Sequence, residues 1–258
     1  MTTPTTTLGF GRGYDERQPV IVLLDTSASM ARPAARPRIA ELNRALADWF
    51  GSVRSQDRLR ARVEVCLIAF DSAVRVFQPD TGALVPGTPA ADARLFAPID
   101  RLTPPELHAD GYTNLLPAIR LALELAARRH RELTDQGLPA LRPLIWLLTD
   151  GAPTDGVGRA LAAAELADDA ALLRRAEEQR ECVFFVVGVR GADRAVLEVL
   201  APKATYMLEQ LDFGEILQFL FHSVDQVHPG DTAASTHQQV ARQVAMRAAF
   251  AGFIEDQL

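Results

Sequence analysis

The feature that most constrains the fold is an unbroken apolar run, Val20–Leu24, followed at once by the oxygen-rich stretch Asp25-Thr26-Ser27-Ala28-Ser29. A short run that is rich in β-branched residues predicts a strand buried on both faces, as in a parallel sheet. In open α/β sheets, ligands bind beyond the carboxyl ends of the strands. A carboxylate and two hydroxyls at alternate positions there, with no Cys or His among them, favour a hard divalent cation such as Mg²⁺.

Strand and helix patterns alternate along the rest of the chain. Further apolar runs predict strands at 62–70, 144–149, 182–189 and 204–208, and a short hairpin partner at 74–77. Apolar residues at helical spacing predict helices at 39–53, 115–126, 158–180, 196–200 and 213–224. This order predicts the α/β class, with a doubly wound, mainly parallel central sheet, helices on both faces and one short antiparallel edge strand.

The pattern also predicts where the domain begins and ends. Residues 1–17 are aperiodic and are expected to form a flexible arm, 18–227 the domain, and 228–258 a C-terminal extension with a weakly amphipathic helix. Residues 78–110 hold six of the sixteen prolines and show no sustained period. A connection of that length is usually functional or mobile, so we expect it to shape a binding surface.

Composition excludes some classes of partner. The net charge of −6, from 33 acidic and 27 basic residues, argues against nucleic acid or an anionic membrane as the main partner. The apolar runs are too short to span a bilayer and no signal-peptide pattern opens the chain, so a cytoplasmic protein is expected. Cys66 and Cys182 lie inside strand-like runs without metal-type spacing, which predicts buried free thiols.

Three separated stretches could supply oxygen ligands on one edge of such a sheet. They are Asp25–Ser29, the loop Asp110–Asn114 before a predicted helix, and Thr149–Asp155 after a predicted strand. Any one of them is equally readable as a set of caps and turns, because Ser, Thr and Asp are favoured where strands turn into helices. Their occurrence together makes a metal site the better reading.

Neighbouring polar residues receive other assignments. Asp155 is predicted to cap a helix that begins near Val157, and Asp71 to sit in a hairpin turn. For Tyr112, a place on the rim of the site and simple packing remain equally open.

The three stretches resemble those of von Willebrand factor A (VWA) domains. DTSAS fits the DxSxS signature of that family, Thr113 follows in a Gly-x-Thr context, and a strand then ends in Thr-Asp-Gly. The resemblance covers roughly residues 18–226. Within it, the stretch Thr149-Asp150-Gly151-Ala152-Pro153-Thr154-Asp155 is most similar to the bacterial, tellurium-resistance-associated TerY-like group.

The resemblance implies a Rossmann-like VWA fold and a metal-ion-dependent adhesion site (MIDAS) that binds Mg²⁺, or Mn²⁺ or Ca²⁺ in its place. Ser27, Ser29 and Thr113 would be hydroxyl ligands, and Asp25 and Asp150 would bind largely through coordinated waters. A protein partner would offer an Asp or Glu to the metal. The TerY-like group further implies a stress-response or phosphorylation-linked assembly, with a protein kinase or a PP2C-type phosphatase as partner.

The sequence favours binding over catalysis at this site. The alternative is a Mg²⁺-dependent phosphohydrolase or phosphotransferase, but aspartate-nucleophile phosphatases need a second Asp where this chain has Ser27. The motifs GxxxxGK[ST], GxSxG and HExxH are absent from the sequence, and no Lys or His is placed as an evident general base. We therefore expect a non-enzymatic interaction module with no catalytic residue. A metal-free scaffold that merely kept the fold is a third reading.

Overall fold

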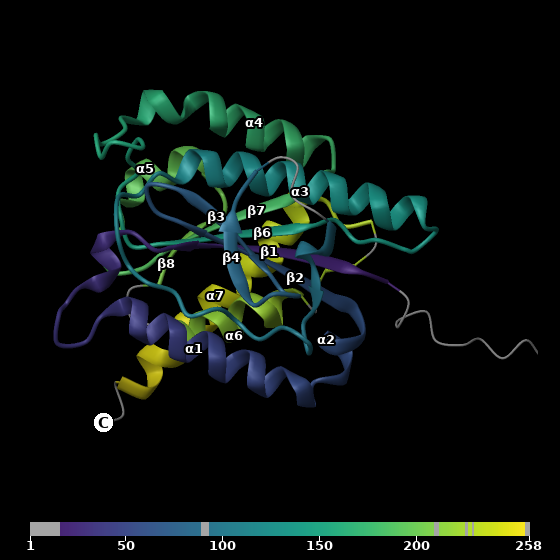
Figure 1. Ribbon diagram of the computed structural model, residues 1–258. Helices are drawn as coiled ribbons and strands as arrows, with labels where there is room; N and C mark the ends of the chain where they lie inside the picture. The colour runs from purple at the N-terminus through teal and green to yellow at the C-terminus, as the bar shows by residue number, and fades with distance from the viewer. Residues whose placement is uncertain (1–15, 89–92, 209–211, 225–226, 229, 256–258) are drawn as a thin grey trace, which may run out of the picture.

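The computed structural model describes residues 16–88, 93–208, 212–224, 227–228 and 230–255. In these residues an eight-stranded sheet runs through the centre of the molecule (Figure 1), with the order β4-β3-β2-β1-β6-β7-β8 and with β5 paired to β2. The strands are β1 (Gln18–Asp25), β2 (Val63–Phe70), β3 (Val74–Gln78), β4 (Ala83–Pro86), β5 (Ala97–Pro98), β6 (Leu144–Thr149), β7 (Val183–Gly188) and β8 (Thr205–Met207).

The centre of the sheet is parallel and buried. β1 pairs in parallel with β2 on one side and β6 on the other, and β7 and β8 extend the parallel part. Every residue of β1, β2, β6 and β7 is buried, as expected for strands covered on both faces. The predicted α/β class with a mainly parallel sheet is confirmed.

Helices cover both faces of this sheet. Figure 1 shows α3 and α4 on one face and α1, α6 and α7 on the other. The helices are α1 (Arg38–Ser52), α2 (Asp57–Arg62), α3 (Leu115–Asp135), α4 (Ala167–Glu178), α5 (Arg194–Leu200), α6 (Phe213–Val224) and α7 (Ala233–Glu255). The apolar stripe of α1 packs on α6, where the rings of Trp49 and Phe221 stack with centroids 3.7 Å apart.

The antiparallel edge is wider than the single short strand that the sequence predicts. β3 pairs with β2 as expected, but β4 and β5 add two further antiparallel pairings. Both lie within 78–110, where proline-interrupted segments of two to four residues are too short to show a period of two. Asp71 occupies the predicted hairpin turn, because its Oδ1 accepts the backbone N–H of Ala73 at 2.9 Å.

The helix after β6 begins later than the sequence predicts. α4 starts at Ala167 and follows a 3₁₀ turn over Ala163–Leu166. The prediction that Asp155 caps a helix near Val157 is wrong. Its Oδ1 accepts the backbone N–H groups of Val157 (3.0 Å) and Arg159 (2.9 Å), which closes a loop. A carboxylate at a chain turn makes the same local hydrogen bonds as a helix cap, so the sequence does not separate the two.

The ends of the chain are only partly described. The arm predicted over 1–17 lies outside the described residues up to residue 15. The beginning of α7 packs onto the domain, with Val240 only 2% exposed. Cys66 and Cys182 are buried and form no disulfide, as predicted. No helix in the described ranges combines the length and apolar character needed to cross a membrane.

Candidate metal site

Asp25, the last residue of β1, is a buried member of the candidate site. Its side chain is buried, with Oδ1 accepting the backbone N–H of Ser27 at 2.8 Å and Oδ2 accepting the Thr149 hydroxyl at 2.5 Å. Burial raises the pKa of Asp25 to about 6, against the lowering effect of these hydrogen bonds, and the nearby Asp150 carboxylate adds to the rise. A carboxylate in this state gains from a cation placed beside it.

The two serines of the first loop connect Asp25 to Asp150. The Oγ atoms of Ser27 and Ser29 are 2.9 Å apart, and the Ser29 hydroxyl donates to Asp150 Oδ1 at 2.6 Å. A short 3₁₀ turn over Ala28–Ala31 follows β1 and sets this arrangement. Asp150 directly follows β6, the strand next to β1 in the sheet, so residues 121 positions apart meet at one sheet edge.

The second loop brings Thr113 to the same place. The N–H of Asp110 donates to the carbonyl of Thr26 at 2.9 Å, and the N–H of Ala28 donates to that of Gly111 at 3.0 Å. Gly111 has a φ of +69°, and a Cβ there would lie 2.5 Å from the Ser72 hydroxyl, so this turn requires glycine. These backbone bonds fasten the Thr113 loop to the DTSAS loop.

Gly151 shows how close the loops come. A Cβ at this position would lie 2.8 Å from the Thr113 Oγ1 and 3.7 Å from the Ser29 Oγ. The hydroxyls of the first two loops therefore both border the glycine of the third. The structure thus gathers all five residues that the sequence singled out: Asp25, Ser27, Ser29, Thr113 and Asp150.

The donor set fits a hard divalent cation. All five side chains offer oxygen, and only two of them are carboxylates, which suits an ion that keeps several waters. Within the described ranges no three His, Cys, Asp or Glu side chains form a metal-binding cluster, so any cation site here depends on the hydroxyls. Asp150 also has a positively charged protein neighbour, because the Arg38 guanidinium donates to its Oδ2 at 2.5 Å.

Two further residues at the candidate site are not among the ligands expected from the sequence. Thr149 reads as the last residue of a buried strand, yet its hydroxyl holds Asp25. Arg38 lies at the start of α1, behind a Pro/Arg-rich linker that gives no sign of contact with Asp150. Arg38 comes from a segment 112 residues away from Asp150 in the chain, so no local pattern could have found it.

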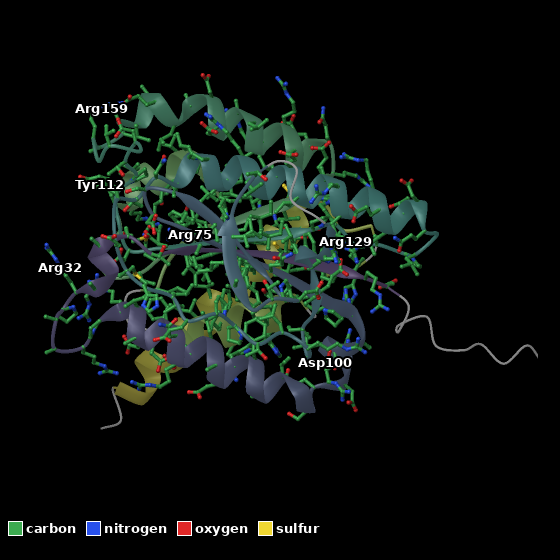
Figure 2. The ribbon with its side chains drawn as sticks, viewed as in Figure 1. Arg32, Arg75, Asp100, Tyr112, Arg129 and Arg159 are labelled. Carbon is green, nitrogen blue, oxygen red and sulfur yellow. The ribbon has the colours of Figure 1, made fainter. Side chains whose placement is uncertain are left out.

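The rim of the site is partly apolar and carries exposed arginines. Tyr112 is 49% exposed and rests against Gly158, and the neighbouring Val157 is 81% exposed. Figure 2 shows Tyr112, Arg32 and Arg159 along the same end of the molecule. The structure thus places Tyr112 on the rim.

Comparison with known proteins rests on the fold. No family model matches the chain, and no curated protein matches it in sequence. Among solved structures, a von Willebrand factor type A protein from Catenulispora acidiphila superposes with a TM-score of 0.51 at 18% identity, over 81% of this chain and 43% of the other. The chain shares its fold with that VWA protein. It spans less than half the length of that protein.

Two further solved structures superpose less well on this chain. The PilB minor pilin from Streptococcus sanguinis, as a D319A mutant, gives a TM-score of 0.49 at 13% identity, over 81% of this chain and 62% of the pilin. The ArnB paralog VWA2 from Sulfolobus acidocaldarius gives 0.43 at 16% identity, over 80% of this chain and 44% of that protein. The similarity to the Catenulispora acidiphila protein confirms the VWA fold expected from the three motifs, and the TerY-like grouping stays a prediction.

Proposed function

We propose that this chain is a divalent-metal-dependent protein-interaction module, in which the five-oxygen site accepts a carboxylate from a partner protein. One observation carries the proposal. Three loops from distant parts of the chain come together at one edge of the sheet. Hydrogen bonds run from Asp25 through Ser27 and Ser29 to Asp150, and the Thr113 hydroxyl borders Gly151 beside them. The shared VWA fold supports a protein-interaction role in general.

The burial of Asp25 supports binding over hydrolysis. Both of its carboxylate oxygens accept hydrogen bonds, and the residue is 1% exposed. A nucleophilic aspartate must reach the substrate with a free oxygen. Asp25 is instead held in place by Ser27 and Thr149, as suits a residue that positions a cation and its waters.

Each part of the site has a role in this proposal. Ser27, Ser29 and Thr113 would hold Mg²⁺, Mn²⁺ or Ca²⁺ through their hydroxyls, while Asp25 and Asp150 would act mainly through bound waters. The bound cation would supply an electrophilic position for a partner Asp or Glu. Because only two carboxylates lie in the site, the cation keeps much of its charge for the partner.

The residues around the site suit a partner that carries acidic groups and also an apolar side chain. Tyr112 and Val157 offer exposed apolar surface beside the site, and such residues often anchor protein interfaces. Arg32 and Arg190 are exposed on loops of the same edge, and neither forms a salt bridge with a described residue. Asp110 is exposed on the same edge, so the attraction of acidic groups there would depend on the bound cation together with these two arginines.

The biological context follows from sequence resemblance. The Thr-Asp-Gly-Ala-Pro-Thr-Asp stretch resembles that of TerY-like proteins. A stress-response or phosphorylation-linked assembly, with a kinase or PP2C-type phosphatase, is therefore the first place to search for the partner.

A peptide selection tests the proposed function. A random peptide display library is bound to the immobilised chain in Mg²⁺ and eluted with EDTA, beside a Thr113→Ala variant as the matched control. We expect the eluted peptides to share an Asp or Glu, and its change to Asn or Gln to weaken binding at least about tenfold. Enrichment that is equal on the variant, or that EDTA does not release, would contradict the proposal.

A further inference from the structure

Arg38 places a positive charge inside the candidate site. Its Nη1 donates to Asp150 Oδ2 at 2.5 Å and to the Ser29 carbonyl at 3.4 Å. The Arg38 side chain is 21% exposed, and that of Asp150 is fully buried. Since Ser29 Oγ donates to Asp150 Oδ1, both oxygens of this carboxylate are engaged within the protein.

A glycine, Gly191, borders the guanidinium of Arg38 and leaves space for it. Gly191, in the loop after β7, has a φ of +107°, and a Cβ there would lie 3.0 Å from the Asp150 carbonyl and 3.9 Å from Arg38 Nη2. Arg36 provides the contrast. It lies two residues before Arg38, in the loop that precedes α1, and pairs with Glu41 at 2.9 Å, with 75% of its side chain exposed. Only one of these two arginines is turned into the site.

The charge of Arg38 changes what the site binds. Asp25 and Asp150 together carry two negative charges when ionised, and Arg38 reduces their sum to one. A site with a divalent cation would then carry a net positive charge, whereas it would be neutral without the arginine. A positive charge at short range disfavours a second cation and favours an anion.

We propose that Arg38 couples metal binding to partner binding, by weakening the affinity of the site for the cation alone and strengthening its affinity for a carboxylate once the cation is bound. This inference rests on the proposed function. A guanidinium carries five N–H donors, and Nη1 provides both of the hydrogen bonds described here. The remaining donors can bind a second oxygen of the partner carboxylate.

The test compares Arg38→Gln with Arg36→Gln as the matched control. Mn²⁺ affinity is measured by calorimetry at low ionic strength and pH 7.5, and acetate binding to the Mn²⁺-loaded protein by water proton relaxation. For Arg38→Gln we expect Mn²⁺ binding to tighten on the order of tenfold and acetate binding to weaken by a similar factor. Arg36→Gln should change either value less than about twofold, because its charge is exposed and screened.

A second variant keeps the test decisive if Arg38→Gln unfolds. Arg38→Lys retains the charge, so its Mn²⁺ affinity should stay within about threefold of that of the wild type. Unchanged Mn²⁺ and acetate affinities in Arg38→Gln, with Mn²⁺ bound by the wild type, would overturn the inference and leave the proposed function standing. Weaker Mn²⁺ binding would also overturn it, since Arg38 would then only position Asp150. Absence of Mn²⁺ binding in every protein would overturn both.

Discussion

Replacing Asp25 with asparagine is expected to stabilise the metal-free protein by about 1–3 kcal/mol at pH 7.5. Burial raises the pKa of this carboxyl from its usual 3.8 to about 6, a shift that corresponds to roughly 3 kcal/mol of unfavourable free energy for the charged form. Asparagine keeps the volume and an oxygen for the backbone N–H of Ser27, and it removes the buried charge. The site thus holds a residue that lowers stability, as functional sites often do.

The raised pKa of Asp25 also predicts how the stability difference between variant and wild type changes with pH. The folded-state pKa of Asp25 lies above the unfolded value, so the unfolded chain releases the proton first and the wild type loses stability as the pH rises from about 4 to 6. The stability difference between Asp25→Asn and wild type should be near zero at pH 4 and reach its plateau above pH 6. Urea unfolding in EDTA measures it.

The control for this experiment is Asp110→Asn, an exposed carboxylate on the same edge. We expect the stability of Asp110→Asn relative to wild type to show no comparable rise with pH, because an exposed carboxylate stays hydrated in the folded protein. Suppose that wild type and Asp25→Asn have equal free energies of unfolding at both pH 4 and pH 7.5. Burial of the Asp25 charge would then not lower stability as the structure indicates.

Breaking the ion pair between Glu64 and Arg129 is expected to destabilise the protein by about 2–4 kcal/mol without changing the site. Arg129 on α3 binds both oxygens of Glu64 on β2, each at 2.6 Å, and Glu64 is 7% exposed. In Glu64→Ala the guanidinium would keep, among the described residues, its longer hydrogen bond to Glu132 at 3.3 Å and its position over the Phe96 ring. Figure 2 places Arg129 at the end of the molecule opposite Arg32 and Tyr112.

Urea unfolding of Glu64→Ala, with Glu124→Ala as an exposed control on α3, measures this effect. The control should stay within about 0.5 kcal/mol of the wild type. Mn²⁺ affinity of the folded Glu64→Ala protein should match that of the wild type, because the substitution lies at the opposite end of β2 from the site. A loss below about 1 kcal/mol would mean that the pair contributes little beyond its desolvation cost.

The fold was largely predictable because its signals are local. Val20–Leu24 and Leu144–Leu148 are continuous apolar runs of strand length, and the stripes of α1 and α6 have clear helical spacing. The errors fall where the signal is short or ambiguous. β4 and β5 are too short to show alternation, and Asp155 makes loop hydrogen bonds that mimic a helix cap.

The gathering of the five oxygen-bearing side chains was predictable from the sequence, and the position of the Arg38 charge beside them was not. Asp25, Ser27 and Ser29 are close in sequence, and Thr113 and Asp150 lie at a helix start and a strand end, where chain topology brings them to one edge. Arg38 and Thr149 enter the site through tertiary contacts with Asp150 and Asp25. Those contacts depend on how the loops pack, which no spacing in the chain encodes.

The most direct test of the central claim is calorimetric titration of the wild type and Asp25→Asn with Mn²⁺. The asparagine variant is expected to be the more stable protein, so unfolding cannot explain a loss of binding. We predict one Mn²⁺ bound per wild-type chain at millimolar concentration or below, and an affinity at least about tenfold weaker in the variant. No binding by the wild type, or equal binding by both proteins, would contradict a metal site at Asp25, Ser27, Ser29, Thr113 and Asp150.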